Sequence, residues 1–176
     1  PDDAIITNGA GNFAIWPGRY MPYTKGRRLL GPQAGSMGAG IPAAVMVKAV
    51  DPSAFVLCFA GDGDFQMSSQ ELGTALQYGA APIILVLNNG TYGTIRMHQE
   101  RECPGRVSGT TLRNPDFAAL AKAYGFHGEK VAKTEDFSAA FERAVASPTG
   151  AVLELVIDPE GISPKTTITA MREAAK

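Results

Sequence analysis

Residues 60–93 read AGDGDFQMSSQELGTALQYGAAPIILVLNNGTYG, and this stretch decides the fold. It contains the end of one strand, a glycine-rich turn with a carboxylate, an amphipathic helix, a second apolar strand and a pair of asparagines. The two strands, residues 55–60 and 83–87, are continuously apolar, which is typical of parallel strands covered on both faces. A strand, a helix and a strand of this length predict a right-handed parallel crossover.

Asp62 and Asn89 each follow the end of one of these strands, 27 positions apart (89 − 62). Gly-Asp-Gly or Asn-Gly taken alone is usually an ordinary turn. Because the carboxyl ends of parallel strands meet at one edge of a sheet, we expect these two side chains to converge. Their oxygens suit Mg²⁺ or Ca²⁺ better than zinc, and Mg²⁺ seldom receives all its ligands from protein. The pattern predicts a metal ion that also binds a diphosphate, aided by backbone amides of residues 61–65.

Strands alternate with helices along the rest of the chain. Further strands are expected at residues 4–7, 27–30, 129–132 and 152–157. Helices are expected at residues 41–50, 68–78, 116–124 and 136–147, the second capped by Ser68 or Ser69 with Leu72, Ala75 and Leu76 on its inner side. Residues 91–112 are expected to form a long loop, and the tail after residue 160 to fray or form a short helix at 170–176. The prediction is an α/β fold, a three-layer open parallel sheet with helices on both faces.

Composition narrows the class of protein. The chain has 176 residues, 45% of them hydrophobic, which suits one domain, residues 1–176. A net charge of −1 disfavours nucleic acid and anionic membrane as partners, and no apolar run reaches the ~20 residues of a membrane-spanning helix. Cys58 and Cys103 form neither a disulfide framework nor a metal spacing, so we expect a cytoplasmic location. The chain starts without methionine, and we expect it to be part of a longer polypeptide.

A second glycine-rich segment precedes the central stretch. Glycine recurs at positions 31, 35, 38 and 40, which lets the backbone approach another group closely. That group is either a ligand or the backbone of a neighbouring element, and the segment by itself does not distinguish them.

Together these segments resemble a known family. The order GDGDFQ, SSQEL and LNNGTYG resembles the diphosphate-binding domain of thiamine diphosphate enzymes of the acetohydroxyacid synthase, pyruvate decarboxylase and benzoylformate decarboxylase group. Gly35-Ser36-Met37-Gly38, with Pro42-Ala43-Ala44, resembles the loop and helix beneath the thiamine in that family. The segment NPDFAALAKAYG resembles a later helix, so the resemblance covers nearly the whole chain.

The resemblance implies a role for individual residues. Asp62 and the Asn89 side chain would bind Mg²⁺, with the backbone oxygen of Thr91 as a third ligand. Met37 would support the folded V shape of thiamine diphosphate, and the Gly35 carbonyl would accept a hydrogen bond from its 4′-amino group. The resemblance also implies that Gly63 and Asp64 contact the diphosphate through their backbone. The other implied cofactor contacts are Ser36, Gly61, Tyr92 and Gly93.

The family's chemistry is decarboxylation of a 2-keto acid, followed by protonation or by condensation with a second carbonyl compound. The resemblance therefore implies a decarboxylase or an acetolactate synthase-like carboligase in which the cofactor supplies the chemistry. The family also needs a glutamate from a pyrimidine-binding domain of the same or a neighbouring subunit. We therefore expect a homo-oligomer in full length and an isolated chain without turnover. The alternatives are a cofactor-binding module without turnover and a nucleotide-binding α/β domain, although the chain has no Gly-x-Gly-x-x-Gly turn and no phosphate-loop lysine.

Three features of the sequence leave alternatives open. Acetohydroxyacid synthases share a Gln-Gly-Met segment and a nearby tryptophan, where this chain has Tyr92-Gly93-Thr94 and His98, and Asn-Asn-Gly-Thr-Tyr-Gly resembles a benzoylformate decarboxylase equally well. His98 is a candidate acid or base, or simply a loop histidine. Asp64 would repel a diphosphate, so we expect its side chain to face solvent or to cap the next helix.

Overall fold

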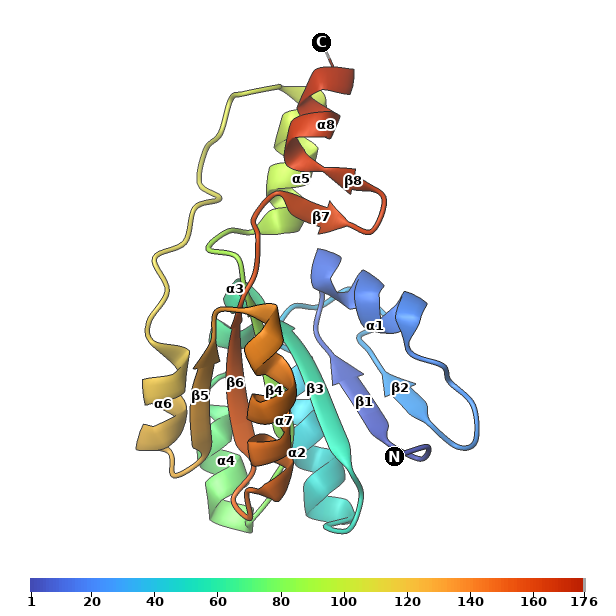
Figure 1. Ribbon diagram of the computed structural model, residues 1–176, viewed down its shortest axis with the longest axis vertical. Helices are drawn as coiled ribbons and strands as arrows, with labels where there is room; N and C mark the ends of the chain where they lie inside the picture. The colour runs from blue at the N-terminus through green and yellow to red at the C-terminus, as the bar shows by residue number, and fades with distance from the viewer. Residues whose placement is uncertain (176) are drawn as a thin grey trace.

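A parallel sheet of six strands forms the centre of the computed structural model, which describes residues 1–175 (Figure 1). The strand order is β2-β1-β3-β4-β6-β5, and every neighbouring pair is parallel. The strands are β1 (Ile5–Asn8), β2 (Arg28–Leu30), β3 (Val56–Gly61), β4 (Ile83–Asn88), β5 (His127–Val131) and β6 (Ala151–Val156). Each lies within two residues of its predicted position, and the open parallel α/β sheet is confirmed.

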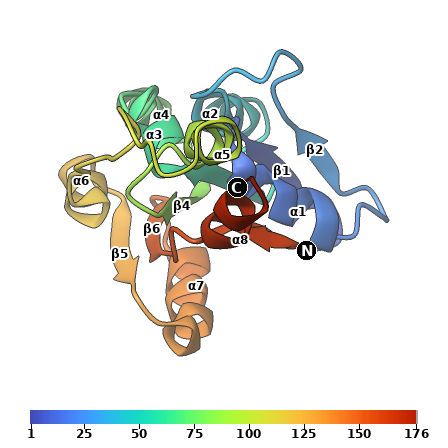
Figure 2. The same ribbon diagram turned by 90° about the horizontal axis from the view of Figure 1, so that it is seen from above.

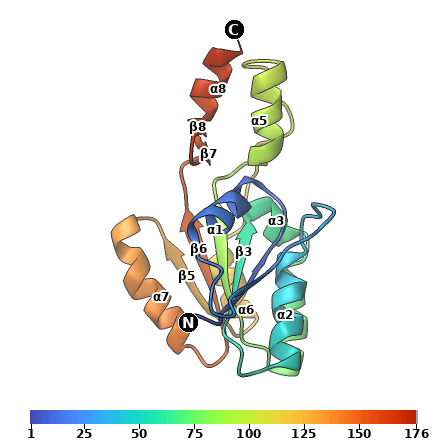
Figure 3. The ribbon, with the colours of Figure 1, turned by 90° about the vertical axis from the view of Figure 1, so that its right-hand side faces the viewer.

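Helices cover both faces of this sheet, so the predicted three layers are present (Figures 2 and 3). Helices α2 (Gly40–Val50), α4 (Glu71–Tyr78) and α6 (Phe117–Ala123) pack on one face, where Ile41, Leu72 and Phe117 are buried together. Helix α7 (Phe137–Ala146) packs on the other face through Ala140 and Ala144. The central strands β3 and β4 are buried on both sides, which explains why their sequences are continuously apolar.

The start of α4 differs from the prediction. The glycine-rich turn after β3 contains a short helix, α3 (Asp62–Gln66), and successive turns lead from it to Glu71. Gln70 is the N-cap of α4 and makes no side-chain capping bond, so neither Ser68 nor Ser69 caps this helix. Those turns already satisfy the backbone donors that a cap would otherwise bind. Leu76 is 60% exposed, because only the stripe with Leu72 and Ala75 faces the sheet.

The predicted long loop is half helical. Helix α5 (Gly93–Glu102) occupies the first part of residues 91–112. The rest of this segment runs back toward the end of β4, where Thr111 forms an isolated antiparallel β-bridge with Thr91. The sequence of α5 has no apolar stripe, so the pattern that indicates an amphipathic helix is missing. Its docking depends instead on Glu100, which is buried and charged.

The tail is ordered rather than frayed. Strands β7 (Gly161–Ser163) and β8 (Thr166–Thr167) form a small antiparallel hairpin that leads into α8 (Ile168–Ala174). Helix α8 lies beside α5, and the two stand above the carboxyl edge of the sheet (Figures 1 and 3). Helix α8 begins two residues before the predicted position, because Thr167 caps it by accepting a hydrogen bond from the backbone of Ala170.

The remaining elements are short helices: the 3₁₀ helices at Asn12–Ala14 and Thr134–Asp136, and α1 (Ile15–Tyr20). No helix within residues 1–175 is both long enough and apolar enough to cross a membrane.

Candidate functional site

A cavity of about 530 Å³ opens at the carboxyl edge of the sheet, and the first residues of α5 line part of it. Segments that follow β1, β3, β4 and β6 form its walls, as expected for an open parallel sheet. Ser36 and His98 are not among the lining residues. The predicted site residues that do line the cavity are Gly35, Met37, Gly61, Asp62, Gly63, Asp64, Asn89, Thr91, Tyr92 and Gly93.

Asp62 is held in one orientation at the start of α3. Its side chain is buried, with the residue 3% exposed. Oδ1 accepts a hydrogen bond from Gly63 N at 2.9 Å, and Oδ2 accepts two, from Gly90 N at 2.8 Å and from Asn114 Nδ2 at 2.7 Å. Burial raises the pKa of the Asp62 carboxyl above its usual value, and the three hydrogen bonds oppose that rise. A carboxylate has about four acceptor positions, so one on Oδ1 stays available.

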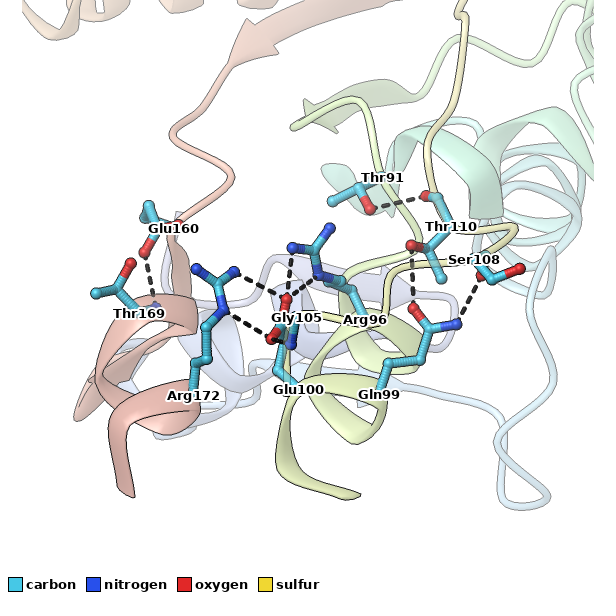
Figure 4. A network of polar contacts seen from close by, with 10 residues as sticks. All are labelled: Thr91, Arg96, Gln99, Glu100, Gly105, Ser108, Thr110, Glu160, Thr169 and Arg172. Carbon is cyan, nitrogen blue, oxygen red and sulfur yellow. Dashed lines mark hydrogen bonds and ion pairs between the residues drawn. The ribbon is translucent and has the colours of Figure 1, made fainter. Parts of the chain in front are cut away.

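Asn89 and Thr91 form a tight turn after β4. Asn89 Oδ1 accepts a hydrogen bond from Thr91 N at 3.1 Å, which leaves a second lone pair on the amide oxygen. The Thr91 hydroxyl donates to the Thr110 carbonyl at 2.8 Å, and Tyr92 N donates to the same carbonyl at 2.9 Å (Figure 4). The returning segment therefore holds the turn in place at the cavity wall.

The charges in the cavity lining are all negative. They belong to Asp62, Asp64 and Asp158, and no lysine or arginine among residues 1–175 lines the cavity. All three donors to Asp62 are neutral, and no ion pair within residues 1–175 involves it. Within the same residues, no three His, Cys, Asp or Glu side chains gather as a metal cluster. A cation here would depend on amide and backbone oxygens as well as Asp62, which are hard donors that suit Mg²⁺.

Asp64 does not face solvent and does not cap α4, so both parts of that expectation are wrong. The residue is 2% exposed, and its Oδ1 accepts hydrogen bonds from Gly38 N at 2.7 Å and Ala10 N at 3.1 Å. A Cβ on Gly9 would overlap this carboxylate, so glycine there permits the close approach. Burial raises the pKa of Asp64, and these bonds to two loops oppose the rise. The Asp64 carboxylate therefore joins the loops of Ala10 and Gly38, which are distant from it in sequence. No local sequence pattern indicates these contacts.

The second glycine-rich segment reaches the same cavity. Gly35 adopts a φ of +67°, which favours glycine, and both Gly35 and Met37 line the cavity. Gly63 lies directly against the Tyr92 ring, where a Cβ would clash. The apolar part of the lining consists mainly of Phe13, Trp16, Phe59, Leu87, Ile95 and Ile162. The cavity is therefore acidic at one end and apolar over most of its wall.

A buried ion cluster lies between α5 and α8 (Figure 4). Glu100 of α5 is fully buried, and its carboxylate accepts hydrogen bonds at 2.8 Å from Arg96 of the same helix and from Arg172 of α8. Gly105 N donates to it at 2.8 Å as well. The bonds from Arg172 and Gly105, with Arg96 beside them, hold the pKa of Glu100 well below its usual range. This cluster joins α5 to α8.

His98 lies on α5 and is exposed. Its Nδ1 lies 2.7 Å from Nη2 of Arg101, one turn further along the helix. The structure thus places His98 on a helix rather than in a loop, and gives it a cationic neighbour. The role of an acid or base at the cavity has no support from this position.

The side chains behind Asp62 were not predicted from the sequence. Asn114 contacts Asp62, and Asn88 and Glu154 lie behind Asn114 in the same chain of hydrogen bonds. The segment Asn114-Pro115-Asp116 signals only a helix start, and Asp116 does cap α6. The one available signal was an acidic residue, Glu154, within an otherwise apolar strand.

Comparisons with known proteins identify the family of this chain. Residues 9–155 match the family described as "Thiamine pyrophosphate enzyme, C-terminal TPP binding domain". The chain is 35% identical over 155 residues to an acetolactate synthase of Arthrospira platensis, covering 87% of this chain and 27% of that protein. It is 34% identical over 160 residues to the acetolactate synthase isozyme 2 large subunit of Escherichia coli K12, covering 90% and 29%.

A solved structure is similar over the same region. It is a thiamine diphosphate-dependent 4-hydroxybenzoylformate decarboxylase of Rhodococcus jostii RHA1, with a TM-score of 0.80 and 32% sequence identity. The match covers 90% of this chain and 30% of that one. The chain therefore spans less than a third of the length of these relatives.

Proposed function

The chain belongs to the thiamine pyrophosphate enzymes, as their C-terminal binding domain, and from that premise we propose that it holds the diphosphate half of thiamine diphosphate through Mg²⁺. The observation that carries the proposal is the buried Asp62 carboxylate, which has only neutral donors and one free acceptor position. A diphosphate would be repelled by the aspartates at the acidic end of the cavity unless a cation lay between them. Asp62 and Asn89 would supply side-chain oxygens to that ion, and Thr91 its backbone oxygen.

The other lining residues would orient the organic part of the cofactor. Gly35 and Met37 follow β2 and are distant in sequence from the turn after β4, but they line the same cavity. They therefore suit the role of thiamine support that the family resemblance implies. Gly61, Gly63, Tyr92 and Gly93 would contact the diphosphate end. Asp64 would act by holding the loops of Ala10 and Gly38 rather than by touching phosphate with its carboxylate. Ser36 is exposed and does not line the cavity, so we expect no direct contact from its side chain.

For the whole protein, we propose a thiamine diphosphate-dependent decarboxylase or acetolactate synthase-like carboligase that acts on a 2-keto acid. Support comes from relatives named acetolactate synthase and from a structural neighbour named 4-hydroxybenzoylformate decarboxylase. When bound, the cofactor supplies the carbon centre that attacks the keto acid, and this chain binds and orients it. The same proposal includes a pyrimidine-binding domain, supplied by the same or a neighbouring subunit, and a homo-oligomeric, cytoplasmic protein. It treats residues 1–176 as a single domain within a longer polypeptide.

For the isolated chain, the alternative of a cofactor-binding module without turnover is favoured by one observation. The buried carboxylates that line the cavity are both engaged in hydrogen bonds, Asp62 with the β4 turn and Asp64 with two loops. Neither is left as a mobile proton donor for the organic half of the cofactor.

The test is calorimetric titration of the chain with thiamine diphosphate, with and without Mg²⁺. We expect binding that requires Mg²⁺ and that weakens by more than about 100-fold in Asp62→Ala, because a direct metal ligand contributes more than its supporting residues do. Asp3→Ala removes an exposed aspartate and serves as the matched control, with binding unchanged. Binding without metal, or wild-type affinity in Asp62→Ala, would contradict the proposal.

A further inference from the structure

Glu154 is a buried acid in the middle of β6. It is 1% exposed and lies between Val86 of β4 and Lys130 of β5 in the strand register. Its Oε1 accepts hydrogen bonds at 2.9 Å from Asn88 Nδ2 and from Lys130 Nζ. Its Oε2 is buried and has no partner within residues 1–175. Such an orphan oxygen costs stability, so an apolar residue would suit this strand better if packing alone mattered.

The contact with Glu154 sets the orientation of the Asn88 amide. A carboxylate oxygen only accepts, so it must face the Asn88 NH₂ group. The Gly90 backbone N–H only donates, and it faces Asn88 Oδ1 at 3.2 Å. These two contacts act on opposite sides of the amide, and each independently requires the same orientation.

Asn88 in turn sets the orientation of Asn114. Asn88 Oδ1 accepts a hydrogen bond from Asn114 Nδ2 at 2.8 Å, and the other proton of that NH₂ group goes to Asp62 Oδ2 at 2.7 Å. Asn114 Oδ1 accepts from Gln66 Nε2 at 3.0 Å, so the amide is bound on both sides. The path from Glu154 to Asp62 therefore consists of alternating donors and acceptors, and reversal of either amide would break it.

We propose that Glu154 is a positioning residue for Asp62, acting through the Asn88 and Asn114 side chains. It fixes Oδ2 of Asp62 as the oxygen that accepts two hydrogen bonds, and so leaves the one free acceptor position on Oδ1, beside the bond from Gly63 N, for a cation. The identity of that cation as the Mg²⁺ of a diphosphate rests on the proposed function, whereas the hydrogen-bond path does not. Supporting residues of this kind affect metal affinity by orienting the direct ligands.

The first test compares Glu154→Met with Glu154→Gln, using Mn²⁺ plus thiamine diphosphate as the probe and electron paramagnetic resonance to measure bound Mn²⁺. Glu154→Met removes the acceptor, and we expect about 10–100-fold weaker Mn²⁺ binding. Glu154→Gln keeps an acceptor oxygen for Asn88, so we expect it to restore most of the affinity. Lys130→Gln is the matched control, since it removes the other partner of Oε1 and leaves the contact with Asn88 in place. Equal losses in Glu154→Gln, Glu154→Met and Lys130→Gln would overturn the proposal in favour of a general loss of the ion pair.

A double-mutant cycle with Asn114→Ala tests the path itself. If Glu154 acts through Asn114, then Glu154→Met should change Mn²⁺ affinity by no more than about twofold in the Asn114→Ala background. Multiplicative losses would show that Glu154 acts by another route and would overturn the proposal. If Glu154→Met does not fold, Asn88→Ala interrupts the path one step later, and the same cycle applies.

A metal-free measurement separates this inference from the proposed function. The side-chain amide resonances of Asn88 and Asn114 are recorded by NMR without metal, and we expect both to shift in Glu154→Met and to stay near their wild-type positions in Lys130→Gln. If the wild type binds no Mn²⁺, the proposed function is contradicted. If the Asn88 and Asn114 resonances nevertheless shift in Glu154→Met, the positioning of Asp62 remains supported. Unchanged Asn114 resonances in Glu154→Met would overturn the positioning role whatever the metal result.

Discussion

Asp62 and Glu100 are both buried carboxylates within one molecule, yet their surroundings are opposite. Glu100 is neutralised by the chain itself, since two guanidinium groups hydrogen-bond to it. Asp62 receives three hydrogen bonds of similar length, all from neutral groups. The pKa of Glu100 is well below its usual range because of its arginine partners, whereas burial raises that of Asp62.

The difference separates a structural acid from the acid that we propose binds a cation. A carboxylate that already has its counter-charges contributes to packing, and Glu100 joins α5 to α8 in this way (Figure 4). A carboxylate that is oriented but not neutralised keeps its charge for a ligand, and Asp62 faces the cavity in this state. Hydrogen-bond number alone would not distinguish them, because what matters is the charge of the donors.

The largest expected effect is on Glu100. Replacing it in Glu100→Gln leaves two arginines facing a neutral amide, and we expect the free energy of unfolding to fall by about 3–5 kcal/mol. Urea denaturation measures this. Glu102→Gln, on the same helix but exposed, is the matched control and should stay within about 0.5 kcal/mol of wild type. A similar small change in both variants would show that the α5 to α8 cluster contributes little.

The next largest effect is the gain in stability on ligand binding, which tests whether Asp62 binds a cation. With saturating Mg²⁺ and thiamine diphosphate at about 100 times the dissociation constant, the native state should gain about 2.7 kcal/mol. We expect Asp62→Asn to lose that gain and yet to lie within about 1 kcal/mol of wild type without ligand, because losing one hydrogen bond is offset by removing a buried charge. Thermal unfolding with and without ligand measures both quantities. A large loss of stability in ligand-free Asp62→Asn would make Asp62 a structural acid like Glu100.

The pH dependence should have opposite signs for the two residues. Glu100 has a lowered pKa, so its contribution to stability is complete above about pH 4.5 and is lost as the pH falls through its folded pKa. Asp62 has a raised pKa, so stability falls as the pH rises above its usual value of 3.8 toward the folded pKa. Urea denaturation across this range should show that Glu100→Gln removes the acid-side loss and Asp62→Asn removes the loss on raising the pH. Identical profiles for both variants would contradict the comparison.

The smallest expected effect comes from an exposed pair. Asp2 and Lys25 lie 3.0 Å apart with most of both side chains in water. We expect Lys25→Ala to change the free energy of unfolding by no more than about 0.5 kcal/mol, because water screens such pairs. The same urea experiment checks this value. A loss comparable to that of Glu100→Gln would mean that burial does not explain the strength of the Glu100 cluster.

Much of the sheet could be predicted because its signals are local. The apolar runs of β3 and β4, and the polar residues directly after them, identify buried parallel strands and place Asp62 and Asn89 at one edge. Helix α5 could not be predicted in the same way, since it has no apolar stripe and its docking depends on Arg172, which lies 72 positions from Glu100. Nor could the surroundings of Asp64, whose partners lie 26 and 54 positions away.

The sequence by itself determined the architecture, the cavity edge and the two oxygen ligands proposed for the metal, because strand burial and strand ends leave a pattern in neighbouring residues. Only the tertiary structure decided which acids are neutralised by arginine, which buried acid receives hydrogen bonds from neutral groups alone, and which side chains orient it. Asn114 reaches Asp62 across 52 positions and Glu154 reaches Asn88 across 66. Contacts at such separations depend on how the strands are ordered in the sheet, and no local spacing records them.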